Sequence, residues 1–543
     1  MRKILSILSV CAIAVSAMAM PARREGMLRK DANGTEKVVY LHGNAFYHYT
    51  TDANGNWLDE ETLAPLSAEA KAQKQQRGEA RMKARRVQQK KMIGTEPNIA
   101  PRGLLIMVNF KNKSFVTPRD TIDSMMNGAN FTRKYKLDYT YYDDYGQSYQ
   151  IKQSISASGS ARQYFQDQSF GQYNPQFDVV GPYTLSQNYS YYGRNNDENV
   201  GYMIKEACEL ADADGVDFTQ YDNNNDGKVD FVYVLYAGEG EADGGGSTTV
   251  WPHNYSLEYY EEYGFSNIAC RVDGKKVANY ACSNEWQHYG QVYNGIGTIC
   301  HEFSHVMGLP DLYETNQNSL GLHTLLDWDI LDYGPYNNDG NTPPSYSAYE
   351  RFFCGWITPR VLKDPENVTL KPINSSQEAL LMCSGDAHNL VGWNPNPKTF
   401  YLLEARNQSG WDKYLPGKGM LITKITYNAT KWDNNEVNNS RTNMGVDLIE
   451  AKANISDASA ATDAFPAGAI NSYVSFTGHE ITNISRVSAS TNIGTITFLY
   501  RGGSPEGIES VQPSEASYQK ILRDGKIVII REGKEYDILG NRL

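Results

Sequence analysis

The chain has 543 residues, with 51 basic and 63 acidic side chains, so its formal net charge is -12. This length gives room for two substantial hydrophobic cores besides a smaller module. The acidic balance argues against nucleic acid as a partner, and the composition leaves the oligomeric state unknown.

Residues 1–19 have the three parts of a secretory signal peptide. Arg2 and Lys3 precede an apolar run over residues 4–17, and the small residues Ala17 and Ala19 form a cleavage site. The run is too short to span a membrane. We therefore predict export, with cleavage after Ala19, to a secreted or cell-surface location; lipoprotein processing at Cys11 is an alternative.

Residues 20–100 differ in composition from the rest of the chain. Residues 38–41 and 45–49 have the pattern of strands and 52–56 that of a turn, which predicts a small β-rich module. Residues 68–91 are rich in Lys, Arg, Gln and Ala and lack an apolar face. This pattern predicts an exposed helix or a disordered linker that proteases cut easily.

From residue 101 to about 365, helical and strand patterns alternate. Residues 103–110 are an apolar strand, and residues 198–211 place their apolar side chains on one helical face. Residues 231–236 form a second apolar run that is typical of a buried strand. These patterns predict an α+β domain with a mixed sheet.

A calcium loop is predicted at residues 222–230. Side-chain oxygens stand at positions 1, 3, 5 and 9 of the loop, and glycine at position 6, but Tyr233 takes the place of the glutamate that an EF-hand has at position 12. The predicted calcium ligands are Asp222, Asn224, Asp226, the Lys228 carbonyl and Asp230. A metal-free turn rich in Asn and Asp is the alternative.

Six cysteines follow the signal peptide, and their even number permits disulfides after export. Cys270 and Cys282 flank a possible hairpin turn at residues 272–275, so we expect that they can face each other across two strands. The sequence does not determine the pairing.

The most specific motif is His-Glu-Phe-Ser-His-Val-Met-Gly-Leu-Pro-Asp at residues 301–311. His301 and His305 are one helical turn apart and share a face, with Glu302 about 100° round the helix. Gly308 can end the helix in a left-handed conformation, so that the chain turns back and presents Asp311. We predict a zinc ion bound by His301, His305 and Asp311.

Three protein ligands leave one zinc position for water, which the metal activates and Glu302 deprotonates as general base. The pattern is that of metzincins, with Asp311 in place of the third histidine. Metzincins also have a methionine turn beneath the metal, and residues 328–334 are similar to it, with Leu331 replacing the methionine. Tyr333 is then the candidate that stabilises the oxyanion, and a core tyrosine is the alternative.

These motifs, with several flanking segments, resemble the immune inhibitor A-like family of secreted bacterial metalloproteases. The flanking segments are 164–165, 169–173, 177–182, 250–253, 349–351, 355–356 and 416–422. The resemblance covers roughly residues 101–500 and implies endopeptidase activity on protein or peptide substrates.

After about residue 365, short strands separated by Gly, Asn and Asp turns predict a β-sandwich-like accessory domain over 366–502. Residues 503–517 form a linker. Residues 518–543 are predicted to form a small meander, which resembles C-terminal sorting tails that secretion machinery recognises. A hairpin that completes the β domain is the alternative.

Together, the patterns predict a secreted zinc endopeptidase with a metzincin-like domain at 101–365 and an inhibitory β-rich propeptide at 20–100. Arg85-Arg86 and Lys90-Lys91 are the candidate activation sites. A catalytically silent adhesion or binding protein that keeps the protease fold is the alternative, and a cysteine peptidase is a further one. An intact Glu302 argues against the former, and the absence of a recognisable nucleophile context around any cysteine argues against the latter.

Overall fold

The computed structural model describes residues 18–84, 102–503 and 518–543, and it leaves short gaps inside these ranges. The gaps are residues 32, 45–46, 144, 263–264, 288–292, 316–321, 388, 453–456, 475–477, 488–493, 524–525, 532–533 and 537–541. The predicted signal peptide before residue 18 and both candidate activation sites lie outside the described residues.

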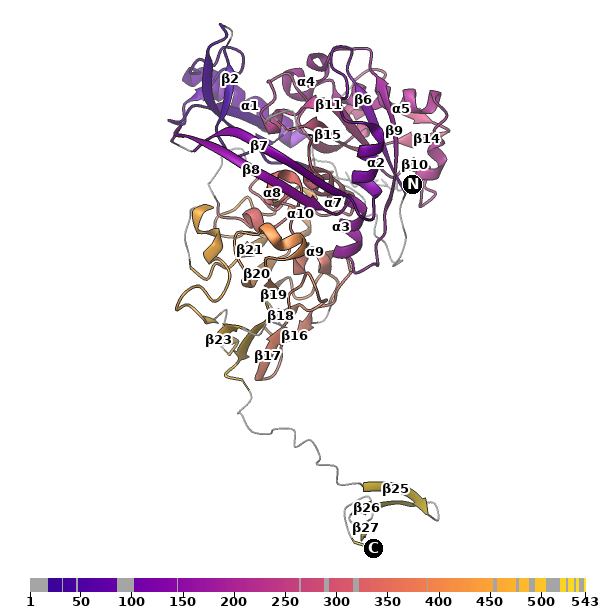
Figure 1. The fold of residues 1–543 in the computed structure, drawn as a ribbon, viewed down its shortest axis with the longest axis vertical. Helices are drawn as coiled ribbons and strands as arrows, with labels where there is room; N and C mark the ends of the chain where they lie inside the picture. Colours follow the sequence, from indigo (N-terminus) through magenta and orange to yellow (C-terminus); the bar gives the residue numbers. More distant parts are fainter. Residues whose placement is uncertain are drawn as a thin grey trace, which may run out of the picture.

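A six-stranded mixed sheet forms the upper part of the molecule (Figure 1). Its order is β1-β12-β15-β11-β6-β9, in which β15, β11, β6 and β9 are parallel, β12 pairs antiparallel with β15, and the edge strand β1 pairs antiparallel with β12. The bounds are β1 Met18–Ala19, β6 Arg102–Asn109, β9 Gln176–Thr184, β11 Val232–Glu239, β12 His253–Ser256 and β15 Asn279–Trp286. The mixed sheet that the sequence predicts is therefore present.

Helices cover both faces of this sheet, which explains why β6 is apolar at successive positions. Leu104 and Ile106 belong to one buried cluster with helix α5 (Val200–Ala213), whereas Leu105 and Met107 belong to another with helix α7 (Gly297–Val306). Because both faces are buried, the strand does not alternate between apolar and polar residues. Helix α5 confirms the amphipathic helix expected over 198–211.

The remaining elements of this region surround the sheet. They are α2 Arg119–Asn127, β7 Thr132–Tyr142, β8 Ser148–Ser158, α3 Ala161–Gln168, α4 Tyr189–Asp197, β10 Lys228–Val229, α6 Leu257–Glu262, β13 Cys270–Val272, β14 Lys275–Val277, α8 Asn337–Gly340 and α9 Ala348–Phe353. Strands β7 and β8 pair as one long antiparallel hairpin.

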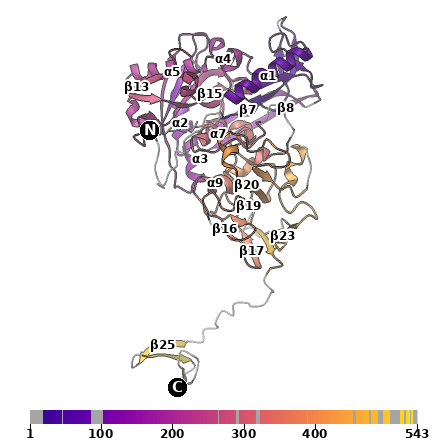
Figure 2. The same ribbon diagram turned by 180° about the vertical axis from the view of Figure 1, so that it is seen from behind.

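The N-terminal module has the order β2-β3-β4-β5, followed by helix α1. Its bounds are β2 Met27–Lys30, β3 Glu36–Asn44, β4 Tyr47–Thr51, β5 Trp57–Leu58 and α1 Ala68–Ala84. The basic stretch is thus helical over its described part. Figure 2 shows this module, with α1, beside the upper end of the mixed sheet.

Two further sheets follow residue 357. One has the order β16-β18-β19-β20-β21, and the other β17-β24-β23-β22. The bounds are β16 Arg360–Val361, β17 Glu366–Leu370, β18 Leu380–Met382, β19 Thr399–Arg406, β20 Gly419–Thr426, α10 Ala429–Asp433, β21 Val446–Leu448, β22 Tyr473–Val474, β23 Glu480–Arg486 and β24 Ile496–Tyr500.

The first of these sheets is buried on both faces. Leu403 and Ile422 share an apolar cluster with Phe498 of the second sheet. Phe400 and Leu421 belong instead to the cluster that contains Phe303 of α7. The hydrophobic core is therefore continuous across residue 365, and the β-rich region and helix α7 belong to the same core.

The cysteines do not pair as expected. All six described cysteines are buried and free. The turn at 272–275 does form, but Cys270 lies opposite Val277 in β14, whereas Cys282 lies opposite His253 of β12. The hairpin is too short to bring these two cysteines together, because residue 282 belongs to the next strand.

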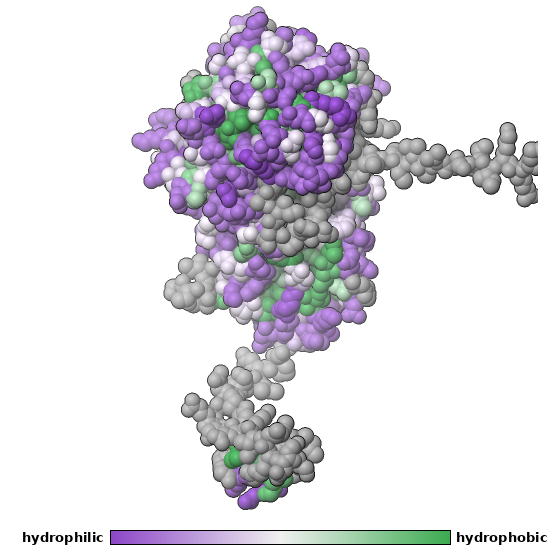
Figure 3. Space-filling view, turned by 90° about the vertical axis from the view of Figure 1, so that its right-hand side faces the viewer, coloured by the Kyte–Doolittle hydropathy of each residue, from purple (hydrophilic) through white to green (hydrophobic). Residues whose placement is uncertain are grey.

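The C-terminal meander consists of β25 Tyr518–Arg523, β26 Lys526–Arg531 and β27 Lys534–Tyr536, all antiparallel. Among the described residues, no helix combines the length and the hydrophobicity needed to cross a membrane. The side of the molecule drawn in Figure 3 is mostly hydrophilic, with scattered apolar patches.

Candidate metal centre

Helix α7 carries the metal motif in the interior of the protein. Every residue of this helix is buried. Ile299, Phe303 and Val306 pack into the main apolar cluster, whereas His301 and His305 lie on the other side, with no exposed surface. The expected separation of a packing face from a chemical face is confirmed.

The chain turns after α7 as the sequence predicts. The helix ends at Val306, and Gly308 takes a left-handed conformation with φ of 84°. The Gly308 N–H donates to the His305 carbonyl at 2.8 Å. Since a side chain is disfavoured at this φ, glycine permits the reversal that directs Asp311 toward the histidines.

The three predicted ligand atoms converge. His301 Nε2 and His305 Nε2 are 3.1 Å apart, and Asp311 Oδ1 lies 3.2 Å from the first and 3.3 Å from the second. A tetrahedral zinc ion with ligands at 2.0–2.1 Å requires donor atoms about 3.3 Å apart. The triangle of donors therefore fits zinc.

The hydrogen bonds of the two imidazoles also suit metal binding. His301 Nδ1 lies 2.7 Å from the Ile330 carbonyl and His305 Nδ1 lies 2.8 Å from the Leu309 carbonyl. A carbonyl only accepts, so each Nδ1 carries a proton, which in the neutral ring leaves the Nε2 lone pair for a metal. Burial lowers the pKa of His301, which favours the neutral form. The two Nε2 atoms and the Asp311 Oδ1 atom thus lie close together, an arrangement that can bind one metal ion.

Glu302 lies beside the histidines and is fully buried. Its Oε1 accepts the Met20 N–H at 3.1 Å, and its Oε2 has no hydrogen-bond partner among the described residues. Burial, and then the charge of Asp311, raises the pKa of Glu302 well above its usual range. A carboxylate in this condition accepts a proton readily.

The turn at residues 328–334 lies directly against the zinc helix. Its Ile330 carbonyl accepts from His301, and Leu331 is fully buried and pairs through its carbonyl with Leu312. Leu331 is therefore part of an apolar floor, where a leucine in place of methionine preserves volume. Tyr333 is partly exposed, and the Arg24 guanidinium stacks 3.5 Å from its ring centre.

Sequence reasoning missed two residues that contact Asp311. The Tyr313 hydroxyl donates to Asp311 Oδ2 at 3.3 Å, and the Asn435 side-chain amide donates to the same oxygen at 2.6 Å. Tyr313 is only two positions from Asp311, so its proximity was accessible from the sequence. Asn435 is 124 residues away, and no local pattern marks it.

Residues 18–24 lie across the metal centre. Met18 and Ala19 form the edge strand β1 and pair antiparallel with Asn254 and His253 of β12. Beyond them, the Met20 carbonyl accepts from the Trp251 indole at 3.0 Å, and the Pro21 carbonyl accepts from the Tyr336 hydroxyl at 2.7 Å. The start of the N-terminal module therefore occupies the place beside Glu302.

The predicted calcium loop is arranged by hydrogen bonds and one ion pair. Asp222 accepts from the Asp226 and Gly227 amides and contacts the Lys275 ammonium group at 2.6 Å. Asn224, Asp226 and Asp230 also accept backbone N–H groups within the loop, whereas the Lys228 side chain pairs with Glu258 outside it. Lys275 supplies a positive charge that a calcium ion would otherwise provide. The calcium site stays a prediction.

Known proteins are similar in sequence to the region that contains this centre. Residues 98–356 match the family described as immune inhibitor A peptidase M6, catalytic domain. The pre-pro-metalloprotease PrtV of Vibrio cholerae serotype O1 (strain M66-2) is 29% identical over 221 residues, covering 36% of this chain and 23% of that protein. Immune inhibitor A of Bacillus thuringiensis subsp. alesti is 25% identical over 220 residues, covering 35% of this chain and 31% of that protein. The chain thus spans less than a third of the length of these relatives. Residues 98–356 are therefore similar to the catalytic domain of immune inhibitor A-like metalloproteases.

Proposed function

We propose that the protein is a secreted zinc-dependent endopeptidase that hydrolyses peptide bonds of extracellular proteins. The observation that carries this proposal is the buried triangle of His301, His305 and Asp311 donor atoms, with the Glu302 carboxyl group beside it. When bound, zinc supplies Lewis-acid polarisation of the scissile carbonyl and lowers the pKa of a water at its open position.

The residues of the chain then have distinct roles. Glu302 accepts the proton of the attacking water and delivers it to the leaving amine, because its buried carboxyl group has a raised pKa. Tyr333 donates a hydrogen bond to the developing oxyanion. Strand β12 pairs with Met18 and Ala19; once these residues are removed, β12 becomes the edge of the sheet and binds an extended substrate in the same antiparallel manner.

Casein degradation by the processed protein tests this proposal. We expect a zinc chelator and Glu302→Ala to abolish it, and thiol alkylation to leave it intact. Persistent cleavage by the Glu302→Ala protein would remove the mechanism. If the wild type is inactive although it binds zinc and is fully processed, the result would favour the alternative of a catalytically inactive binding protein. The cysteine-peptidase alternative is weak, since Cys300 is buried and burial raises its pKa, which disfavours the thiolate.

We also propose that residues 20–100 keep the enzyme latent. Residues 20–22 lie between Glu302, Trp251 and Tyr336, where a substrate would have to bind. Cleavage after Ala19 would leave the charged Met20 amino group next to the Glu302 carboxyl group, which strengthens that contact. A secreted, active enzyme that begins at residue 20 would refute this proposal.

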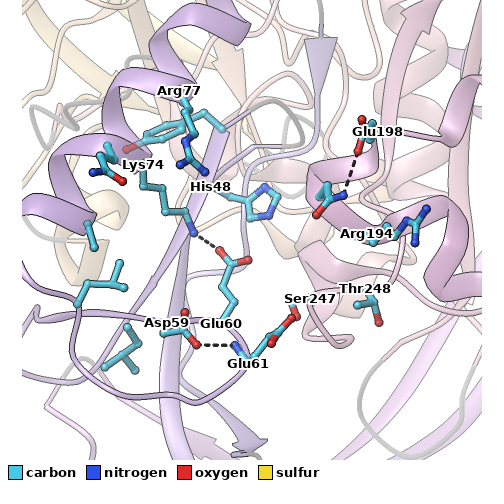
Figure 4. Close-up of a pocket in the computed structure, with 16 residues that line it drawn as sticks. His48, Asp59, Glu60, Glu61, Lys74, Arg77, Arg194, Glu198, Ser247 and Thr248 are labelled. Carbon is cyan, nitrogen blue, oxygen red and sulfur yellow. Dashed lines mark hydrogen bonds and ion pairs between the residues drawn. The ribbon is translucent and has the colours of Figure 1, made fainter. Parts of the chain in front are cut away.

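Charged contacts secure the rest of the module. Arg23 pairs with Asp243 at 2.8 Å, and both side chains are buried. His48 lies 3.4 Å from buried Glu241, close to Glu60. His48 and Glu60 line a cavity of about 730 Å³ (Figure 4). Glu241 lies close to both residues. Lys74 pairs with Glu60, and Arg29 is 3.9 Å from Glu241, so cations already balance both carboxylates and the cluster favours ion pairing over metal binding.

The signal peptide, the C-terminal tail and the calcium loop belong to the same proposal. The signal peptide directs export, and the tail at 518–543 is a candidate signal for secretion machinery. If calcium binds the 222–230 loop, adding calcium to the metal-free protein raises its melting temperature. An unchanged melting temperature would mean that the loop is only a turn.

A further inference from the structure

The side chain of Asn435 contacts the third zinc ligand from outside the matched catalytic domain. The family match ends at residue 356, whereas Asn435 follows helix α10 in the β-rich region. It is 5% exposed, so the contact is buried. An interaction of this kind is a feature of the whole chain and not of the catalytic domain alone.

Asn435 and Asp311 make two hydrogen bonds. The Asn435 Nδ2 group donates to Asp311 Oδ2 at 2.6 Å, and Asn435 Oδ1 accepts the Asp311 backbone N–H at 2.7 Å. The amide therefore holds both the backbone and the carboxylate of Asp311. Because the donor engages Oδ2, the remaining oxygen, Oδ1, is the one that lies 3.2 Å from His301 Nε2 and 3.3 Å from His305 Nε2.

The backbone of Asn435 is fixed as well. Its φ is 54°, and its carbonyl accepts from the Thr315 hydroxyl at 2.6 Å. Asn438 of the same loop donates to the Leu312 carbonyl at 2.7 Å. Since the loop is attached to residues 312 and 315, which closely follow Asp311, the Asn435 amide is held in one orientation before it meets the carboxylate.

We propose that Asn435 is a positioning residue, which selects Asp311 Oδ1 as the metal ligand and restrains the carboxylate to one-oxygen binding. The inference rests on the proposed zinc site. Hydrogen-bonded partners of metal ligands orient those ligands, and their loss commonly weakens metal affinity by about 10- to 100-fold.

Two variants separate this role from simple attachment of the loop. Asn435→Gly removes the side chain and tolerates the positive φ, so the backbone contact with Thr315 is retained. Asn435→Asp keeps the shape and the acceptor for the Asp311 N–H but places a carboxylate against Asp311 Oδ2. The matched control is Asn439→Ala, since Asn439 donates to the Thr315 hydroxyl at 2.9 Å from the same loop.

The experiment measures zinc affinity of the full chain by competition with a chromophoric chelator, after circular dichroism has verified folding of each metal-free variant. We expect Asn435→Gly and Asn435→Asp to bind zinc about 10- to 100-fold more weakly than the wild type, and Asn439→Ala to bind as tightly. In cobalt-substituted protein, the visible spectrum of Asn435→Asp should also change, because the carboxylate geometry changes.

Other outcomes overturn the inference. Unchanged affinity in Asn435→Asp would show that only loop attachment matters, and equal weakening in Asn439→Ala would assign the effect to the loop in general. Unchanged affinity in both Asn435 variants would remove the role altogether. A folded wild type that binds no zinc would instead contradict the proposed function, so the two failures are distinguishable.

Discussion

Individual residues of the centre differ in how far the sequence could specify them. His301, His305 and Asp311 lie within eleven positions, and one helical turn followed by a glycine reversal is enough to bring them together. Met20 contacts Glu302 across 282 positions. Such a contact depends on the packing of separate elements, which no local pattern encodes. The convergence of these three side chains was therefore predictable, and the distant contact of Met20 with Glu302 was not.

At this scale, the hydroxyl group of Tyr333 is the candidate that acts on the oxyanion. Tyr333→Phe in the processed enzyme should lower kcat by about 100- to 1000-fold with little change in KM, because the donor matters chiefly in the transition state. Tyr313→Phe is the matched control, since the hydroxyl of this buried tyrosine contacts Asp311 Oδ2. Steady-state kinetics on a fluorogenic peptide give kcat and KM for both variants. A large loss in Tyr313→Phe alone would transfer the role to Tyr313.

The main elements of the matched domain follow from patterns that extend along the chain. Strand β6 and helices α5 and α7 appear where apolar periodicity places them. The turn at 328–334 was predicted by resemblance, but its support is tertiary: Asp329 caps the Leu331 N–H, and Asp332 accepts the Leu326 N–H at 2.7 Å. Cys270 and Cys282 do not face each other as expected, because the strand partner of Cys270 depends on where β14 ends.

The turn should make the stability of the protein depend on pH. Burial raises the pKa of Asp332 to about 7, so the folded chain keeps a proton that the unfolded chain releases above its ordinary pKa of 3.8. Stability from this group is therefore present at low pH and is lost as pH rises between about 4 and 7, by about 1.4 kcal/mol for each unit of pKa shift.

Asp332→Asn keeps a neutral side chain and an acceptor at every pH. We expect its melting temperature, relative to the wild type, to increase steadily from acidic to neutral pH. Thermal unfolding followed by circular dichroism at several pH values measures this difference. A constant difference across the range would mean that Asp332 is ionised in the folded protein, as its ordinary pKa would give.

At the scale of the whole molecule, the catalytic domain is enclosed by its neighbours. The β-rich region shares the core around Phe303, and the N-terminal module places residues 20–24 over the site. The sequence predicted the β-rich character of both segments. It did not predict that the core continues across residue 365, because apolar periodicity identifies a buried face but not the surface that covers it.

Latency should depend on the buried ion pair of Arg23 with Asp243. Breaking a buried pair costs about 3–5 kcal/mol, because one charge is left without its partner. We therefore expect the unprocessed Arg23→Ala protein to degrade casein faster than the unprocessed wild type. Lys30→Ala is the control, since Lys30 pairs with Glu36 on the exposed surface of the same module. If the unprocessed Arg23→Ala protein degrades casein no faster than the unprocessed wild type, this pair does not hold the module in place.

The central claim is that His301, His305 and Asp311 bind one zinc ion. Elemental analysis of the folded, purified chain, before and after dialysis against a mild chelator, tests it most directly. The account predicts one zinc per chain in the wild type and a strong loss of zinc in Asp311→Ala after the same dialysis. A folded wild type without zinc, or an Asp311→Ala protein that retains it as firmly as the wild type, would contradict the account.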